Sequence, residues 1–207
     1  MRKNNRIMRG IVLLCGIVLL FGGAWGATNL RAKYVTSITL TGSVDFSPLL
    51  ATDLTLQEHV AERKADGSYQ LKTTTAAVNQ NAYKVMPGVD IPKDPFITVT
   101  ERTTVPGYLY VEVIDSLPDT VTYRLTNNWS LLSGVTGKNG GSVYVYVGSD
   151  LTVSPTTRTI EILNGNIVTV SDQYAGESFS LSFYAYLYKK NENETASATF
   201  ARVSQGT

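Results

Sequence analysis

The segment "ESFSLSFYAYLYKK", residues Glu177–Lys190, alternates between two kinds of side chain. Successive side chains of a β-strand point to opposite faces of the sheet, so this period of two predicts a strand with one apolar face. The apolar face comprises Phe179, Leu181, Phe183, Ala185 and Leu187. The opposite face comprises Ser180, Ser182, Tyr184, Tyr186 and Tyr188.

The three tyrosines of the second face, Tyr184, Tyr186 and Tyr188, form a candidate interaction surface. Tyrosine combines a large contact area with a polar tip, so an exposed stripe of this kind suits a protein–protein interface. Tyrosine also favours β-strands in general, so ordinary sheet composition accounts for the stripe equally well. The sequence leaves both interpretations open.

Short runs of the same alternating pattern recur along most of the chain. Residues 34–46, "YVTSITLTGSVDF", predict one long half-buried strand. Further strands are predicted in "FITVTER" (96–102), "GYLYVEVID" (107–115), "TVTYRL" (120–125), "GSVYVYVGS" (141–149), "RTIEIL" (158–163), "NIVTVSD" (166–172) and, at the C-terminus, "ATFARV" (198–203). Turn sequences such as "VPGY", "GKNGG" and "LNGN" separate these runs. The pattern predicts an all-β fold, either a two-sheet antiparallel β-sandwich or a barrel.

One segment near residues 52–65, within "TDLTLQEHVAERKADG", has a helical pattern. Thr52 or Asp53 is a suitable N-cap, and Leu56, Val60 and Ala61 are spaced to form an apolar stripe. The rest of the segment is polar, so a long loop is the alternative. We therefore expect a short helix or loop insertion here.

Residues 1–27 are typical of a secretory signal peptide. A basic start without acidic residues precedes the apolar run "IVLLCGIVLLF" and the small-residue stretch "GGAWGA". We expect cleavage between Ala27 and Thr28. An uncleaved membrane anchor is the alternative, but residues 11–27 lie at the low edge of the length that spans a bilayer and include four glycines.

Signal removal changes the charge and the cysteine content of the chain. Four of the 18 Lys and Arg residues, and none of the 17 Asp and Glu residues, lie in residues 1–27, so the exported chain is mildly acidic. This balance argues against a nucleic-acid partner, which requires a basic patch. The single cysteine, Cys15, is also removed, so the exported chain depends on its hydrophobic core for stability. A domain of about 180 residues is large enough for this.

The sequence contains no convincing catalytic or metal-binding motif. His59 is the only histidine, whereas a zincin motif needs two histidines one helical turn apart. We expect His59 to lie with Glu58 and Glu62 on a solvated polar face. Asp90 and Asp94 flank prolines, and we favour hydrogen bonds to turn amides over a cation site for both. We expect no catalytic residue, no metal and no cofactor.

Four stretches together resemble the TasA/camelysin family, exported biofilm-matrix fibre proteins of Gram-positive bacteria. They are "LLFGGAWGAT" (19–28), "VTSITLTGSVDF" (35–46), "NAYKVMPGVDIPKDPFITVT" (81–100) and "FSLSFYAYLYKKNENETASATFARV" (179–203). The first is similar to the signal ending cut by a SipW-type signal peptidase, and the second to the first strand of the family. The third resembles the segment that contains Pro-Gly before a strand, and the fourth the closing strand and tail.

The resemblance implies a jelly-roll sandwich that polymerises into fibres. In such fibres the freed N-terminal segment of one subunit adds as a strand to the next subunit. In this chain the donor segment would be residues 28–37, followed by a β-sandwich domain at residues 38–207. The donor segment comprises Thr28, Asn29, Leu30, Arg31, Ala32, Lys33, Tyr34, Val35, Thr36 and Ser37.

The resemblance also implies the partners and the location of the protein. The partners would be further copies of the same chain, joined head to tail, a SipW-type signal peptidase and a minor matrix protein. The protein would be secreted, would lie in the extracellular matrix or at the cell surface, and would not be an enzyme.

Two other functions stay open at this point. Camelysin-type relatives have been described as surface metalloproteases, and such an activity would need a metal site. A monomeric cell-surface binding module, for example for carbohydrate, would use exposed tyrosines and Trp129.

Overall fold

The computed structural model describes residues 36–38, 44–46, 53–100, 107–148 and 157–204. Strands make up 49% of the described residues, which include one short helix, and the predicted all-β sandwich is confirmed. The strands are β1 (Thr36–Ile38), β2 (Val44–Phe46), β3 (Asp53–Gln57), β4 (Val60–Arg63), β5 (Tyr69–Lys72), β6 (Asn81–Tyr83), β7 (Ile91–Pro92), β8 (Phe96–Thr100), β9 (Gly107–Asp115), β10 (Val121–Thr122), β11 (Trp129–Thr136), β12 (Ser142–Tyr146), β13 (Thr157–Glu161), β14 (Ile167–Val170) and β15 (Leu181–Lys189). A 3-10 turn, η1 (Asn164–Asn166), precedes β14, and the helix α2 (Ala196–Ser204) follows β15.

The largest sheet has the strand order β11-β12-β9-β15-β2. Its central pair, β9 and β15, is antiparallel and in continuous register from Leu181 opposite Asp115 to Lys189 opposite Gly107. β2 joins the edge of β15 in parallel, with Val44 opposite Ala185. This parallel edge strand departs from the purely antiparallel sandwich that the sequence predicts.

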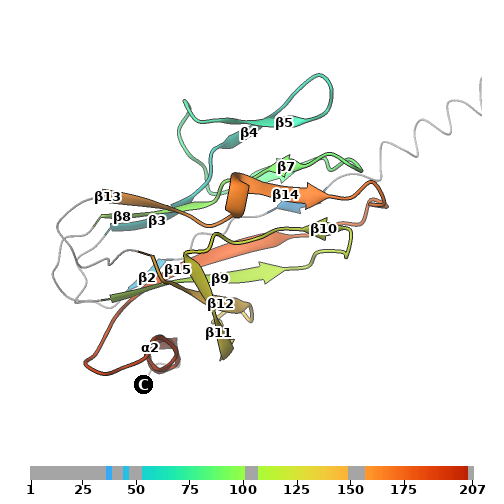
Figure 1. Ribbon diagram of the computed structural model, residues 1–207. Helices are drawn as coiled ribbons and strands as arrows, with labels where there is room; N and C mark the ends of the chain where they lie inside the picture. The colour runs from blue at the N-terminus through green and yellow to red at the C-terminus, as the bar shows by residue number, and fades with distance from the viewer. Residues whose placement is uncertain (1–35, 39–43, 47–52, 101–106, 149–156, 205–207) are drawn as a thin grey trace, which may run out of the picture.

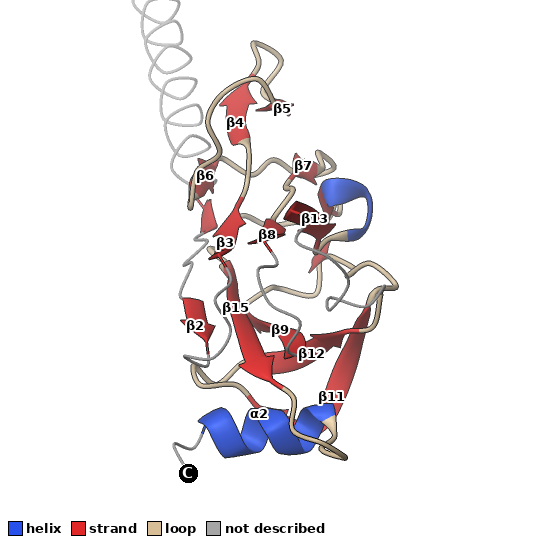
Figure 2. Cartoon of the chain, turned by 90° about the vertical axis from the view of Figure 1, so that its left-hand side faces the viewer, coloured by secondary structure: helices blue, strands red, loops and turns tan. Residues whose placement is uncertain are grey.

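A second layer of strands lies across the core from the five-stranded sheet (Figure 1). It contains the sheet β13-β8-β3 and the sheet β10-β14-β7. The hairpin of β4 and β5 projects beyond this layer, on the side away from α2 (Figure 2). The molecule therefore has three levels, which are a helix, a sandwich and a projecting hairpin.

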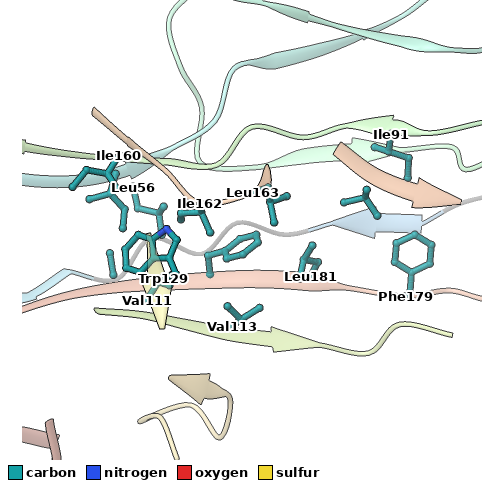
Figure 3. Close-up of a cluster of buried hydrophobic side chains, with 14 of the residues drawn as sticks. Leu56, Ile91, Val111, Val113, Trp129, Ile160, Ile162, Leu163, Phe179 and Leu181 are labelled. Carbon is teal, nitrogen blue, oxygen red and sulfur yellow. The ribbon is translucent and has the colours of Figure 1, made fainter. Parts of the chain in front are cut away.

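The main core fills the space between the two layers (Figure 3). Leu181, Phe183, Ala185 and Leu187 of β15 all lie in it, so the predicted apolar face of this strand is confirmed. Leu56, Ile160 and Ile162 meet them from the opposite layer. Trp129 joins the layers at the edge, because its indole N–H donates to the carbonyl of Glu161 at 2.9 Å.

Two predicted elements have a different structure from the one expected. Residues 53–65, the described part of the segment 52–65, do not form a helix: Leu54 and Leu56 are buried on alternate positions of β3, and β4 follows. The segment "ATFARV" lies in α2 and not in a strand. Thr195 caps this helix, since its hydroxyl oxygen accepts a hydrogen bond from the Ala198 amide at 3.2 Å.

The predicted long strand over residues 34–46 is divided between two sheets. Its described parts are β1, which pairs with β6, and β2, which pairs with β15. Residues 34–35 and 39–43 lie outside the described residues. An alternating sequence therefore serves two separate strands here.

Two leucines on strands offer a direct test of the core. Leu181 is fully buried, whereas Leu131 on the edge strand β11 is 52% exposed. We expect Leu181→Ala to lower the free energy of unfolding by about 2–5 kcal/mol, because it removes buried methyl groups and leaves a cavity. Leu131→Ala should change it by no more than about 0.5 kcal/mol. Urea unfolding of both variants measures the difference, and equal effects would contradict this description of the core.

Candidate functional site

The described end of the predicted donor segment forms β1. Thr36, Ser37 and Ile38 pair antiparallel with Tyr83, Ala82 and Asn81 of β6. The predicted cleavage residues Ala27 and Thr28, and the predicted donor residues up to Val35, lie outside the described residues. The structure therefore places the described end of the predicted donor segment on β6 of the same chain.

The strand β6 is anchored by its own side chains on the side of the core. The buried Asn81 accepts a hydrogen bond from the Ala61 amide at 3.0 Å and donates one to the His59 carbonyl at 2.8 Å. Tyr83 is 1% exposed and donates from its hydroxyl to the Pro92 carbonyl at 3.1 Å. Burial raises the pKa of Tyr83. Ala82, between them, is exposed, so β6 is fixed to the core on one face and open to solvent on the other.

The segments that anchor β6 are joined to each other through His59 and Asp94. The His59 amide donates to one oxygen of Asp94 at 3.0 Å, and Nδ1 lies 2.5 Å from the other oxygen. The His59 ring also lies against Phe96, with 5.1 Å between the ring centroids. The prediction of a solvated polar face at His59 is therefore wrong, because this side chain is only 25% exposed.

The two aspartates of the proline-rich segment bind amides, but not those of a local turn. Asp94 reaches His59, which is 35 residues away in sequence. Asp90 accepts a hydrogen bond from the Val170 amide of β14 at 3.2 Å. These carboxylates connect distant strands instead of closing their own turn.

A buried ion pair lies directly beside the contact of His59 with Asp94. Glu58 and Lys93 are both 0% exposed, and Lys93 Nζ lies 2.7 Å from Glu58 Oε2. Sequence reasoning missed this pair, since Glu58 lies in the segment interpreted as helix and Lys93 lies between prolines. The two residues come together only because β3 and β8 pair with their ends aligned, Gln57 opposite Phe96.

The described residues contain no group of three or more His, Cys, Asp and Glu side chains placed to hold a metal ion. Among the helices of this part of the chain, none has the length and apolarity needed to cross a membrane. Four charged or titratable side chains instead form two adjacent pairs, Glu58 with Lys93 and His59 with Asp94. These pairs join the segment after β3 to the segment before β8.

The candidate tyrosine surface is mostly buried. Tyr186 and Tyr188 are 2% and 0% exposed, and Tyr184 is partly buried. Phe200 of α2 packs between them and Tyr110, with ring centroids 5.1–5.7 Å apart. The interpretation of an exposed interaction surface is wrong for Tyr186 and Tyr188, because α2 covers this face of the five-stranded sheet (Figure 1).

A buried carboxylate binds one of the tyrosines that β15 carries on this face. Glu112 of β9 is 0% exposed and accepts the Tyr186 hydroxyl at 2.6 Å. Its other oxygen accepts the Asn139 and Gly141 amides at 2.9 and 2.8 Å, which fixes the turn between β11 and β12. Burial and the hydrogen bond to Glu112 raise the pKa of Tyr186. A Cβ at Gly137 in this turn would lie 2.0 Å from the Glu112 carboxyl carbon, so a larger residue there would displace this carboxylate.

No protein-family model and no curated protein matches this sequence. The residues themselves therefore carry the functional argument.

The docking of α2 offers a test by pH. Glu194, just before the helix, accepts hydrogen bonds from the Arg202 guanidinium at 2.8 and 2.9 Å. These bonds lower the pKa of Glu194 from 4.5 to about 2. Because the pKa of Glu194 is lower in the folded protein, its carboxylate stabilises the fold at pH values above about 4.5. This stabilisation is lost as the pH falls from about 4.5 toward 2.

We expect the hydrogen-exchange protection of the α2 amides to fall over that pH interval in the unmodified protein. In Arg202→Gln the protection should be lower at neutral pH and should change less on acidification. Glu192→Gln, a change at an exposed position, is the matched control and should behave like the unmodified protein. An unchanged pH profile in Arg202→Gln would contradict a role of this pair in docking α2.

Proposed function

We propose that the chain is an exported structural protein that polymerises into extracellular matrix fibres, without catalytic activity. The observation that carries the proposal is the pairing of β1 with β6. β1 is the described end of the donor segment, and its partner strand is held in place by Asn81 and Tyr83. The edge of β6 is suited to receive the same strand from another copy.

Exchange of this strand between copies preserves its hydrogen bonds. Main-chain pairing supplies the affinity of an added strand, and alternate side chains supply its specificity. A neighbouring β1 would make the same register with β6 as the resident β1 does, so little interaction energy is lost in the exchange. Each copy donates at one end and accepts elsewhere, and such a heterologous contact generates an open filament.

Cleavage between Ala27 and Thr28 would release the donor segment. Before cleavage, the apolar residues 11–27 would hold the segment at the membrane. The partners of the proposed function are further copies of this chain, a SipW-type signal peptidase and a minor matrix protein. The proposed location is the extracellular matrix or the cell surface.

The two alternative functions find little support among the described residues. A metalloprotease would need a metal site, and His59 and Asp94 bind each other in this part of the chain. A binding module would need exposed aromatic side chains, but Trp129 is 7% exposed and Tyr186 and Tyr188 are buried.

Deletion of the donor segment tests the proposal. We expect the protein that begins at Thr28 to form filaments in electron microscopy, and the same protein without residues 28–37 to sediment as a monomer. Deletion of residues 205–207 is the control at the other end of the chain and should leave filaments. Filaments of unchanged number and form without residues 28–37 would contradict strand donation.

A further inference from the structure

The ion pair of Glu58 with Lys93 has an unusual environment for two charged groups. Both side chains are 0% exposed, and the Tyr83 ring lies 6.0 Å from Lys93 Nζ. Burial of an ion pair removes it from water, and this penalty is offset only when further hydrogen bonds satisfy the remaining atoms. Glu58 Oε1 is also buried, and it has no hydrogen-bond partner among the described residues. The carboxylate is therefore only half satisfied.

Burial at this position disfavours the charged form of Lys93. Burial lowers the pKa of Lys93 from its ordinary value, and Glu58 acts in the opposite direction. Transfer of one proton across the 2.7 Å contact gives an amine and a carboxylic acid, which are less costly to bury than two ions. After this transfer the neutral amine lies in contact with the carboxyl group.

The backbone holds the two groups in place. The Glu58 amide donates to the Val78 carbonyl at 2.9 Å, and the Val78 amide donates back at 2.8 Å. The Lys93 amide donates to the Asn166 carbonyl at 2.9 Å, and Pro92 and Pro95 restrict the chain on either side. Well-oriented intramolecular reactions reach effective concentrations of about 10⁵–10⁸ M. Holding the two groups in contact therefore favours their condensation.

We propose that Lys93 and Glu58 form an intramolecular isopeptide bond in the folded protein. Lys93 first passes a proton to Glu58 Oε2. The lone pair of Nζ attacks Glu58 Cδ and forms the N–C bond. A second proton moves from Nζ to the carboxyl hydroxyl, the Cδ–O bond breaks, and one water molecule leaves. The product is a neutral amide, so two buried charges disappear and no oxidant or reductant is needed.

The position of this bond indicates its role. It ties the end of β3 to the segment between β7 and β8, at the base of the β4–β5 hairpin. Asn81 and Tyr83, which anchor β6, bind these same two segments. The exported chain has no cysteine, and an isopeptide bond would supply the covalent cross-link that it lacks. The inference does not depend on fibre formation.

Mass spectrometry of the folded wild-type protein tests the bond directly. We expect an intact mass that is lower than the sequence mass by one water molecule. Trypsin should fail to cleave after Lys93 and should release peptide 34–63 joined to peptide 85–102. A full sequence mass, with free peptides 34–63, 85–93 and 94–102, would overturn the proposal.

The same digest contains a matched control. Lys72 lies 2.9 Å from Glu62 on the projecting hairpin, but both side chains are partly exposed, at 38% and 48%. This pair lacks the burial that the proposed reaction requires, so we expect complete cleavage after Lys72. A cross-link at Lys72 would contradict the requirement for burial.

Two variants distinguish isopeptide formation between Lys93 and Glu58 from other causes of a lower mass. Lys93→Arg removes the nucleophilic amine and should restore the full mass. Glu58→Gln should lose ammonia instead of water and give the same product mass as the wild type. The wild-type measurement stands even if a variant fails to fold. Loss of one water molecule that persists in Lys93→Arg would contradict the proposal.

Discussion

The pairing of β9 with β15 is the constraint on which the rest of the structure depends. These nine-residue strands lie at the centre of the largest sheet and bury side chains on both faces. Toward the second layer they bury the aliphatic residues of the main core, and toward α2 they bury tyrosines and Glu112. Both faces are covered, so a further strand can join this sheet only at an edge. The short strand β2 occupies the edge beside β15.

The second constraint is the junction at the base of the projecting hairpin. Consecutive residues of one segment, Glu58 and His59, contact consecutive residues of another, Lys93 and Asp94. Asn81 adds β6 to this junction. The result is a rigid support behind a short strand whose outer edge pairs with β1. A strand that is fixed from behind loses little entropy when its partner changes, which favours exchange between copies.

The sequence predicts an element well where a regular alternation of apolar and polar residues determines its secondary structure. The alternation in residues 177–190 predicts β15 and its apolar face correctly, and "GYLYVEVID" predicts β9 with its observed bounds. Local sequence patterns are ambiguous where tertiary contacts determine the secondary structure. Leu56, Val60 and Ala61 have helical spacing, but the alternate burial of Leu54 and Leu56 against the core determines strand β3.

The candidate site was less accessible to sequence reasoning. Pairs such as Glu58 with Lys93 are 35 residues apart, and no local pattern relates them. The burial of Tyr186 and Tyr188 depends on α2, which the sequence predicts as a strand. An alternating pattern identifies the two faces of a strand, but the element that covers each face follows only from the whole fold.

The central claim is that β1 of one copy can pair with β6 of another. Ser37 and Ala82 are register partners, and neighbouring Cα atoms of antiparallel strands lie within the range that a disulfide spans. Residues 28–207 contain no other cysteine. Ser37→Cys and Ala82→Cys proteins, purified separately, mixed during assembly and oxidised, should give a covalent dimer with one copy of each. Filaments that form from the mixture without this dimer would contradict the exchange of β1.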